Sequence, residues 1–114
     1  MAKLIYKIVT PSQWDEALND NVFKGAPIDL ADGYIHFSTR EQVVETAEKH
    51  FRGTGRLLLL AFDCVCFGDT LKWEPSRGGA LFPHLYTDLD PALCVAKHEL
   101  LEREDGTHIF PDGF

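Results

Sequence analysis

The spacing of apolar and polar residues divides the chain into short extended segments and two amphipathic helices. The run Leu57–Phe62 is continuously apolar and has the length of a strand, which is typical of a strand buried on both faces. Leu4–Val9 is rich in β-branched and aromatic residues and indicates another strand. Further extended segments are expected at Tyr34–Ser38, Leu71–Glu74, Leu81–Tyr86, Leu93–Leu101 and Thr107–Phe110.

Two motifs of the capping-box type predict where the helices begin. Thr10-Pro11-Ser12-Gln13 opens a helix that ends near residues 19–21, and Thr39 with Gln42 opens a helix over residues 40–50. The glycine and proline between them indicate a loop over residues 22–33. The Asp-Gly turn at 105–106 favours a hairpin, and therefore a strand rather than a helix in the ambiguous segment before it. The pattern predicts one α+β domain over residues 1–114, with two helices in its N-terminal half and a mixed, mostly antiparallel sheet.

The segment Tyr34–Ser38 combines strand periodicity with side chains that can carry chemistry. Alternation places Tyr34, His36 and Ser38 on one face, opposite two apolar residues. An imidazole there can take or give a proton near neutral pH. Thr39 opens the following helix, whose first backbone N–H groups favour anions. The alternative is an edge strand with a solvated polar face and a histidine of structural importance only.

A second group of candidates lies near the turn at residues 76–79. Glu74 ends one extended segment, and His84 and Tyr86 share a face of the next. A carboxylate beside an imidazole fixes its tautomer, so we predict that His36, Glu74 and His84 line one pocket. The alternatives are a core Trp73 beside a surface glutamate, and partial burial of the histidine face.

Composition restricts the classes of partner. The chain has 114 residues and a net charge of −7, which opposes sequence-independent binding to nucleic acid and to anionic lipid. No apolar run approaches the roughly 18 residues of a membrane span. Three cysteines without an export signal suggest reduced thiols in the cytoplasm. Cys64 and Cys66 could begin a zinc site, but no second close pair follows, so we expect small apolar fillers and no metal.

Several motifs together resemble a known family. The stretch Asp32–Thr39, the pair Trp73-Glu74 and the stretch Phe82–Tyr86 are similar to domain-of-unknown-function family 952, and the resemblance covers essentially the whole chain. It implies a fold similar to the ADP-ribosyltransferases, a split mixed sheet that cradles NAD. The same resemblance implies a small-molecule or nucleotide ligand and leaves the oligomeric state open.

A looser similarity extends to RNA 2′-phosphotransferases of the same fold. Ile35–Ser38 is similar to their histidine-containing stretch, and Lys7 stands where their first-strand histidine would be. The resemblance implies an enzyme acting on NAD or a related ADP-ribose-type nucleotide, with a non-catalytic binding module as the alternative. On the enzyme hypothesis the catalytic residues are His36, Glu74 and His84, and the ligand-binding residues are Lys7, Tyr34, Ser38, Thr39, Trp73 and Tyr86.

Overall fold

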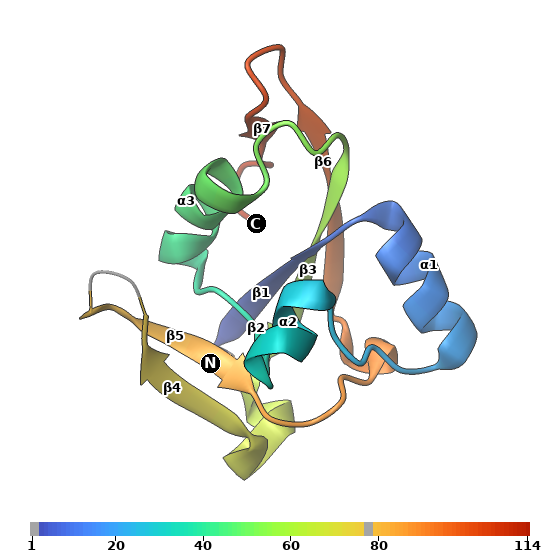
Figure 1. Ribbon diagram of the computed structural model, residues 1–114, viewed down its shortest axis with the longest axis vertical. Coiled ribbons are helices and arrows are strands. Elements are labelled where there is room, and N and C mark those ends of the chain that lie inside the picture. The colour runs from blue at the N-terminus through green and yellow to red at the C-terminus, as the bar shows by residue number, and fades with distance from the viewer. Residues whose placement is uncertain (1–2, 77–78) are drawn as a thin grey trace.

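Strand β3 (Leu57–Asp63) is the centre of the larger of two sheets in the computed structural model, which describes residues 3–76 and 79–114. It pairs antiparallel with β1 (Leu4–Val9) on one side and β6 (Ala96–Glu102) on the other. β7 (His108–Ile109) extends the sheet beyond β6 through the expected hairpin (Figure 1). The prediction of a buried central strand at Leu57–Phe62 is confirmed.

Both faces of β3 are apolar because each face supports a separate core. Leu58 and Phe62 pack with helix α1 (Pro11–Asp20) and with the second sheet. Leu57 and Leu59, on the opposite face, pack against helix α3 (Arg40–His50). The alternation of side chains along a strand therefore accounts for a run without a polar position.

The predicted helices form, and a third was missed. Thr10 and Gln13 exchange both capping-box hydrogen bonds at the start of α1. The segment predicted as a loop contains helix α2 (Pro27–Asp32). Its two large apolar side chains, Ile28 and Leu30, are 60% and 65% exposed, whereas Asp29 is 2% exposed. Such a reversed pattern gives no amphipathic signal, so periodicity could not find this helix.

The smaller sheet consists of β2 (Ile35–His36), β5 (Leu81–Leu85) and β4 (Leu71–Pro75), in the order β2-β5-β4. In Figure 1 the β4–β5 hairpin projects at the lower left, away from β6 and β7. All strand pairings of the described residues are antiparallel, so the expectation of a mixed sheet is wrong while the α+β class is confirmed. Among the described connections, Cys64–Thr70 and Pro91–Leu93 are 3₁₀ segments.

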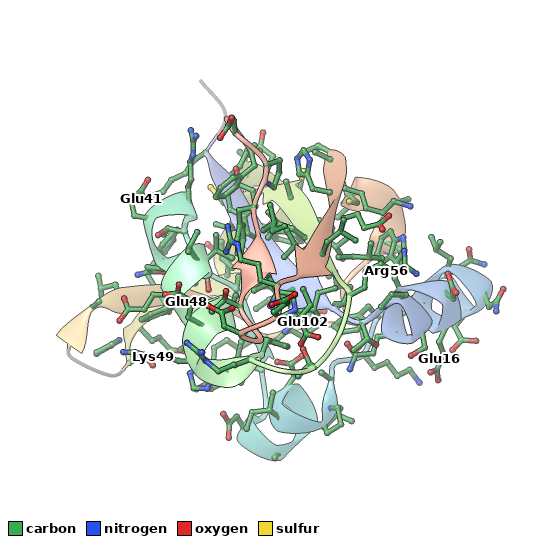
Figure 2. All side chains as sticks on the ribbon, turned by 90° about the horizontal axis from the view of Figure 1, so that it is seen from above. Glu16, Glu41, Glu48, Lys49, Arg56 and Glu102 are labelled. Carbon is green, nitrogen blue, oxygen red and sulfur yellow. The ribbon has the colours of Figure 1, made fainter. Side chains whose placement is uncertain are left out.

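Charged side chains lie on the outer surfaces of helices α1 and α3. Figure 2 shows Glu16 on α1 at the outer edge of the molecule, and on α3 the side chains of Lys49 and Glu45 are 56% and 67% exposed. Most of the described acidic side chains are therefore solvated, with Asp29 as a buried exception. Within the described residues, the helices are too short or too polar for any of them to cross a bilayer.

Candidate functional site

The smaller sheet has one apolar face and one polar face. Ile35 lies opposite Leu85 in the β2–β5 register, and both side chains are buried in the core. The next pair in the register is His36 and His84, whose side chains lie on the other face. Their ring centroids are 5.6 Å apart in an edge-on arrangement. Antiparallel pairing thus brings together two histidines that are 48 positions apart in the chain.

Glu74 on β4 holds His84 and Tyr86 together. His84 Nδ1 lies 2.9 Å from Glu74 Oε1, and the Tyr86 hydroxyl donates to the same oxygen at 2.6 Å. These bonds, that from Tyr86 first, lower the pKa of the Glu74 carboxyl, and the bond to Glu74 raises the pKa of Tyr86 to about 12. Because an ionised carboxylate only accepts, a neutral His84 carries its hydrogen on Nδ1 and has a lone pair on Nε2.

Tyr34 joins the two histidines into one aromatic cluster. Its ring stacks on His84 with centroids 4.1 Å apart and an interplanar angle of 20°. The ring centroids of His36 and Tyr86 lie 4.7 Å and 5.3 Å from that of Tyr34. Burial, followed by the carboxylates of Asp32 and Glu74, raises the pKa of the Tyr34 phenol, so it stays neutral near pH 7.

Asp29, which the sequence analysis missed, anchors His36 from behind. Its buried carboxylate accepts from His36 Nδ1 at 2.6 Å, from the His36 backbone N–H at 3.1 Å and from Lys7 Nζ at 2.9 and 3.1 Å. It also accepts from the Ala26 backbone N–H at 2.8 Å, which caps α2. An aspartate two residues after a proline that begins a helix was the signal that could have identified it.

The charge state of Asp29 depends on these donors. Burial alone would raise its pKa, but the hydrogen bond from His36 and the charge and hydrogen bonds of Lys7 outweigh it and lower the pKa to about 2. Burial lowers the pKa of Lys7 as well, against the opposing effect of Asp29. Asp29 is therefore a carboxylate at any physiological pH, and it fixes the orientation of the His36 ring.

The second nitrogen of His36 faces another carboxylate. His36 Nε2 lies 2.9 Å from Asp32 Oδ2, at the end of α2. A neutral imidazole can donate to only one of Asp29 and Asp32, so both contacts are satisfied together only when both ring nitrogens carry hydrogen. His84 differs, because no described residue forms a hydrogen bond with its Nε2.

Four predicted ligand-binding residues lie away from the polar face. The Ser38 hydroxyl pairs with Thr46 of α3 at 3.2 Å, because β2 ends at residue 36 and the chain then crosses to β1. The prediction that Ser38 shares a face with Tyr34 and His36 is therefore wrong. Thr39 is the N-cap of α3. Trp73 lies on the apolar face of its sheet, with Lys3 Nζ 4.3 Å from its ring centroid, and Lys7 is buried against Asp29.

A cavity of about 260 Å³ lies beside the aromatic cluster, between α2 and the segment that follows β5. Tyr34 and Tyr86 line both the cavity and the polar face, whereas His36, Glu74 and His84 lie outside the cavity lining. The three predicted catalytic residues are thus gathered on one face next to the cavity rather than inside it. The cavity is lined by Lys24, Asp29, Leu30, Gly33, Tyr34, Ile35, Leu85, Tyr86, Thr87 and Asp88.

Two other features lie apart from this face. A larger cavity of about 580 Å³ lies along α1 and α2, and none of the predicted site residues lines it. The three cysteines are free thiols, and no group of His, Cys, Asp and Glu in residues 3–76 and 79–114 is arranged to hold a metal ion. The polar face of the smaller sheet is therefore where the candidate site lies.

Comparison with known proteins gives a family and close structural relatives. The family described as "Protein of unknown function (DUF952)" matches residues 8–96. A crystal structure of protein CC0527 from Caulobacter crescentus is 47% identical, with a TM-score of 0.90 over 93% of each chain. A solution NMR structure of CC0527 is 48% identical, with a TM-score of 0.81 over 91% of this chain and 90% of that one. No curated protein matches the chain.

Proposed function

Because the chain belongs to the family described as "Protein of unknown function (DUF952)", we propose its function from the site itself: it binds a small nucleotide-type ligand on the polar face of the smaller sheet. NAD and ADP-ribose derivatives are the larger ligands of that class. The observation that carries the proposal is the pair of facing histidines, each oriented by a carboxylate and both contacted by Tyr34. In this proposal His84 exchanges a proton with the bound ligand.

The geometry of His84 supports its role as acid and base. Glu74 holds Nδ1, so Nε2 of this largely buried ring, whose side chain is 6% exposed, is the nitrogen left for a ligand in a defined tautomer. Stacking on Tyr34 fixes the plane of the ring. A ring held at two points loses little further freedom when a ligand binds, which favours both affinity and proton transfer.

Two lysines near the polar face can contact an anionic group of the ligand, beside the carboxylates of Asp32 and Glu74. Lys72 lies opposite His84 in the β4–β5 register and therefore on the same face of the sheet. Lys24 lines the adjacent cavity, and neither lysine forms a salt bridge within residues 3–76 and 79–114. A phosphate or diphosphate group near these lysines would gain charge-assisted hydrogen bonds.

The second candidate function is binding without chemistry. It is favoured by His36, whose two ring nitrogens already face Asp29 and Asp32 and are not available to a reacting group. The two functions differ in turnover, since a binding module holds the nucleotide unchanged whereas an enzyme with His84 as base consumes it.

A thermal-shift panel with NAD, ADP-ribose and AMP tests the proposal. A probe at about 100 times its dissociation constant adds roughly 2.7 kcal/mol to the free energy of unfolding. His84→Ala should weaken binding at least tenfold, about 1.4 kcal/mol. His98→Ala, in β6 of the other sheet, is the matched control and should bind like the wild type. Absence of a shift with every nucleotide would overturn the proposal, and chromatography of the incubated nucleotide distinguishes turnover from binding.

A further inference from the structure

We infer that the 260 Å³ cavity beside the histidines receives one flat heteroaromatic ring of the ligand, a nucleobase-type ring that carries N–H donors. This inference rests on the proposed function, because the anionic part of the same ligand would lie on the histidine face. Beyond the proposed function, it specifies the chemical class of the ring, where the ring binds and which residue recognises it.

The walls of the cavity suit a flat ring. Tyr34 and Tyr86 lie on the side nearest the histidines, with ring centroids 5.3 Å apart. Leu30 of α2, which is 65% exposed, lies on the outer side, whereas the side chains of Ile35 and Leu85 behind the cavity are buried in the core. Aromatic side chains stack on the faces of bases, and the exposed Leu30 side chain offers a further apolar contact.

The polar groups of the cavity define the edge of the ring. Asp29 already accepts from Lys7, His36 and Ala26, so its oxygens are engaged within the protein. Asp88 also lines the cavity and forms no salt bridge or side-chain hydrogen bond with described residues. A free carboxylate accepts hydrogen bonds and donates none, so it selects a ring with N–H groups on the facing edge.

The size of the cavity limits the ligand to one ring system inside. Pockets that enclose drug-sized ligands are usually about 300–1,000 Å³. A cavity of about 260 Å³ is below that range and cannot enclose a dinucleotide. In NAD one nucleotide would lie outside, so a mononucleotide such as AMP already contains every group that the site recognises.

Matched probes separate the ring from the anionic part. We expect wild-type protein to bind AMP at least tenfold more tightly than ribose 5-phosphate, which has the anion without the ring. Thr87 is an exposed lining residue, so Thr87→Trp should occupy part of the cavity and abolish most of that difference, and Asp88→Ala should reduce it. Ribose 5-phosphate should bind both variants as it binds the wild type.

Controls keep this test separate from folding and from the proposed function. Leu30→Trp should act like Thr87→Trp, whereas Ile28→Trp, on the same helix with similar exposure and outside both cavity linings, should not. Equal binding of AMP and ribose 5-phosphate, with both still sensitive to His84→Ala, would overturn the ring site and leave the proposed function intact. Absence of binding by either probe would overturn both. Calorimetric titration gives the affinities, and circular dichroism verifies the fold of each variant.

Discussion

The two sheets use their faces differently. In the four-stranded sheet the central strand buries apolar side chains on both faces, against α1 on one side and α3 on the other. In the three-stranded sheet one face packs into the core and the other carries His36, Glu74 and His84. The larger sheet can therefore supply most of the folding free energy, while the smaller one keeps polar side chains at fixed positions.

In addition to the shared apolar core, an ion-pair network couples the two sheets. Asp29 of α2 binds Lys7 of β1, in the larger sheet, and His36 of β2, in the smaller one. The carboxylate is buried, so its removal leaves a buried ammonium without its anion and a histidine without its anchor. The sheets are consequently distinct in composition but share one electrostatic junction.

The largest expected effect is at this junction. Asp29→Ala should lower the free energy of unfolding by about 3–5 kcal/mol, because breaking a buried ion pair leaves an uncompensated charge. Asp32→Ala, which removes the more exposed partner of the same histidine, should cost much less. Urea denaturation of both variants measures the difference, and equal losses would show that Asp29 does not couple the sheets.

A cavity-creating substitution in the larger sheet should lower the free energy of unfolding nearly as much, without changing ligand binding. Leu59→Ala should destabilise the protein by about 2–5 kcal/mol, because Leu59 is fully buried in β3. Binding of AMP by the folded protein should not change. Leu101→Ala, at an exposed position of β6 in the same sheet, should stay within about 0.5 kcal/mol of the wild type. A loss of AMP affinity in folded Leu59→Ala would contradict the division between the sheets.

Acid should lower the contribution of the Asp29 junction to the free energy of unfolding. The pKa of Asp29 falls from an ordinary value of 3.8 to about 2 on folding, so ionised Asp29 stabilises the protein above pH 3.8. That contribution, about 2 kcal/mol, is lost as the pH falls from 3.8 through 2. Asp29→Asn should lack this component, and the difference between the two pH–stability curves isolates it. Parallel curves for wild type and variant over this range would contradict the assignment.

Sequence reasoning worked where a side chain's environment follows from local periodicity. The continuous apolar run of β3 could only be buried on both faces, and the alternation of His84 and Tyr86 placed them on one face of β5. It failed where the environment depends on distant residues. Asp29 is buried because Lys7 and His36 surround it, and Ser38 leaves the polar face because the chain crosses to Tyr6. The local pattern marks Asp29 only as a helix cap, and it encodes neither its contacts with Lys7 and His36 nor the crossing at Ser38.

The central claim is that the two facing histidines form a ligand site. Titration of ¹⁵N-labelled protein with AMP, followed through the imidazole nitrogen signals, tests it most directly because His98 in the other sheet serves as an internal control. We expect saturable shifts at His84 Nε2 and at His36, with the His98 signals unchanged. Shifts of equal size at all three histidines, or none at His36 and His84 under saturating AMP, would contradict it.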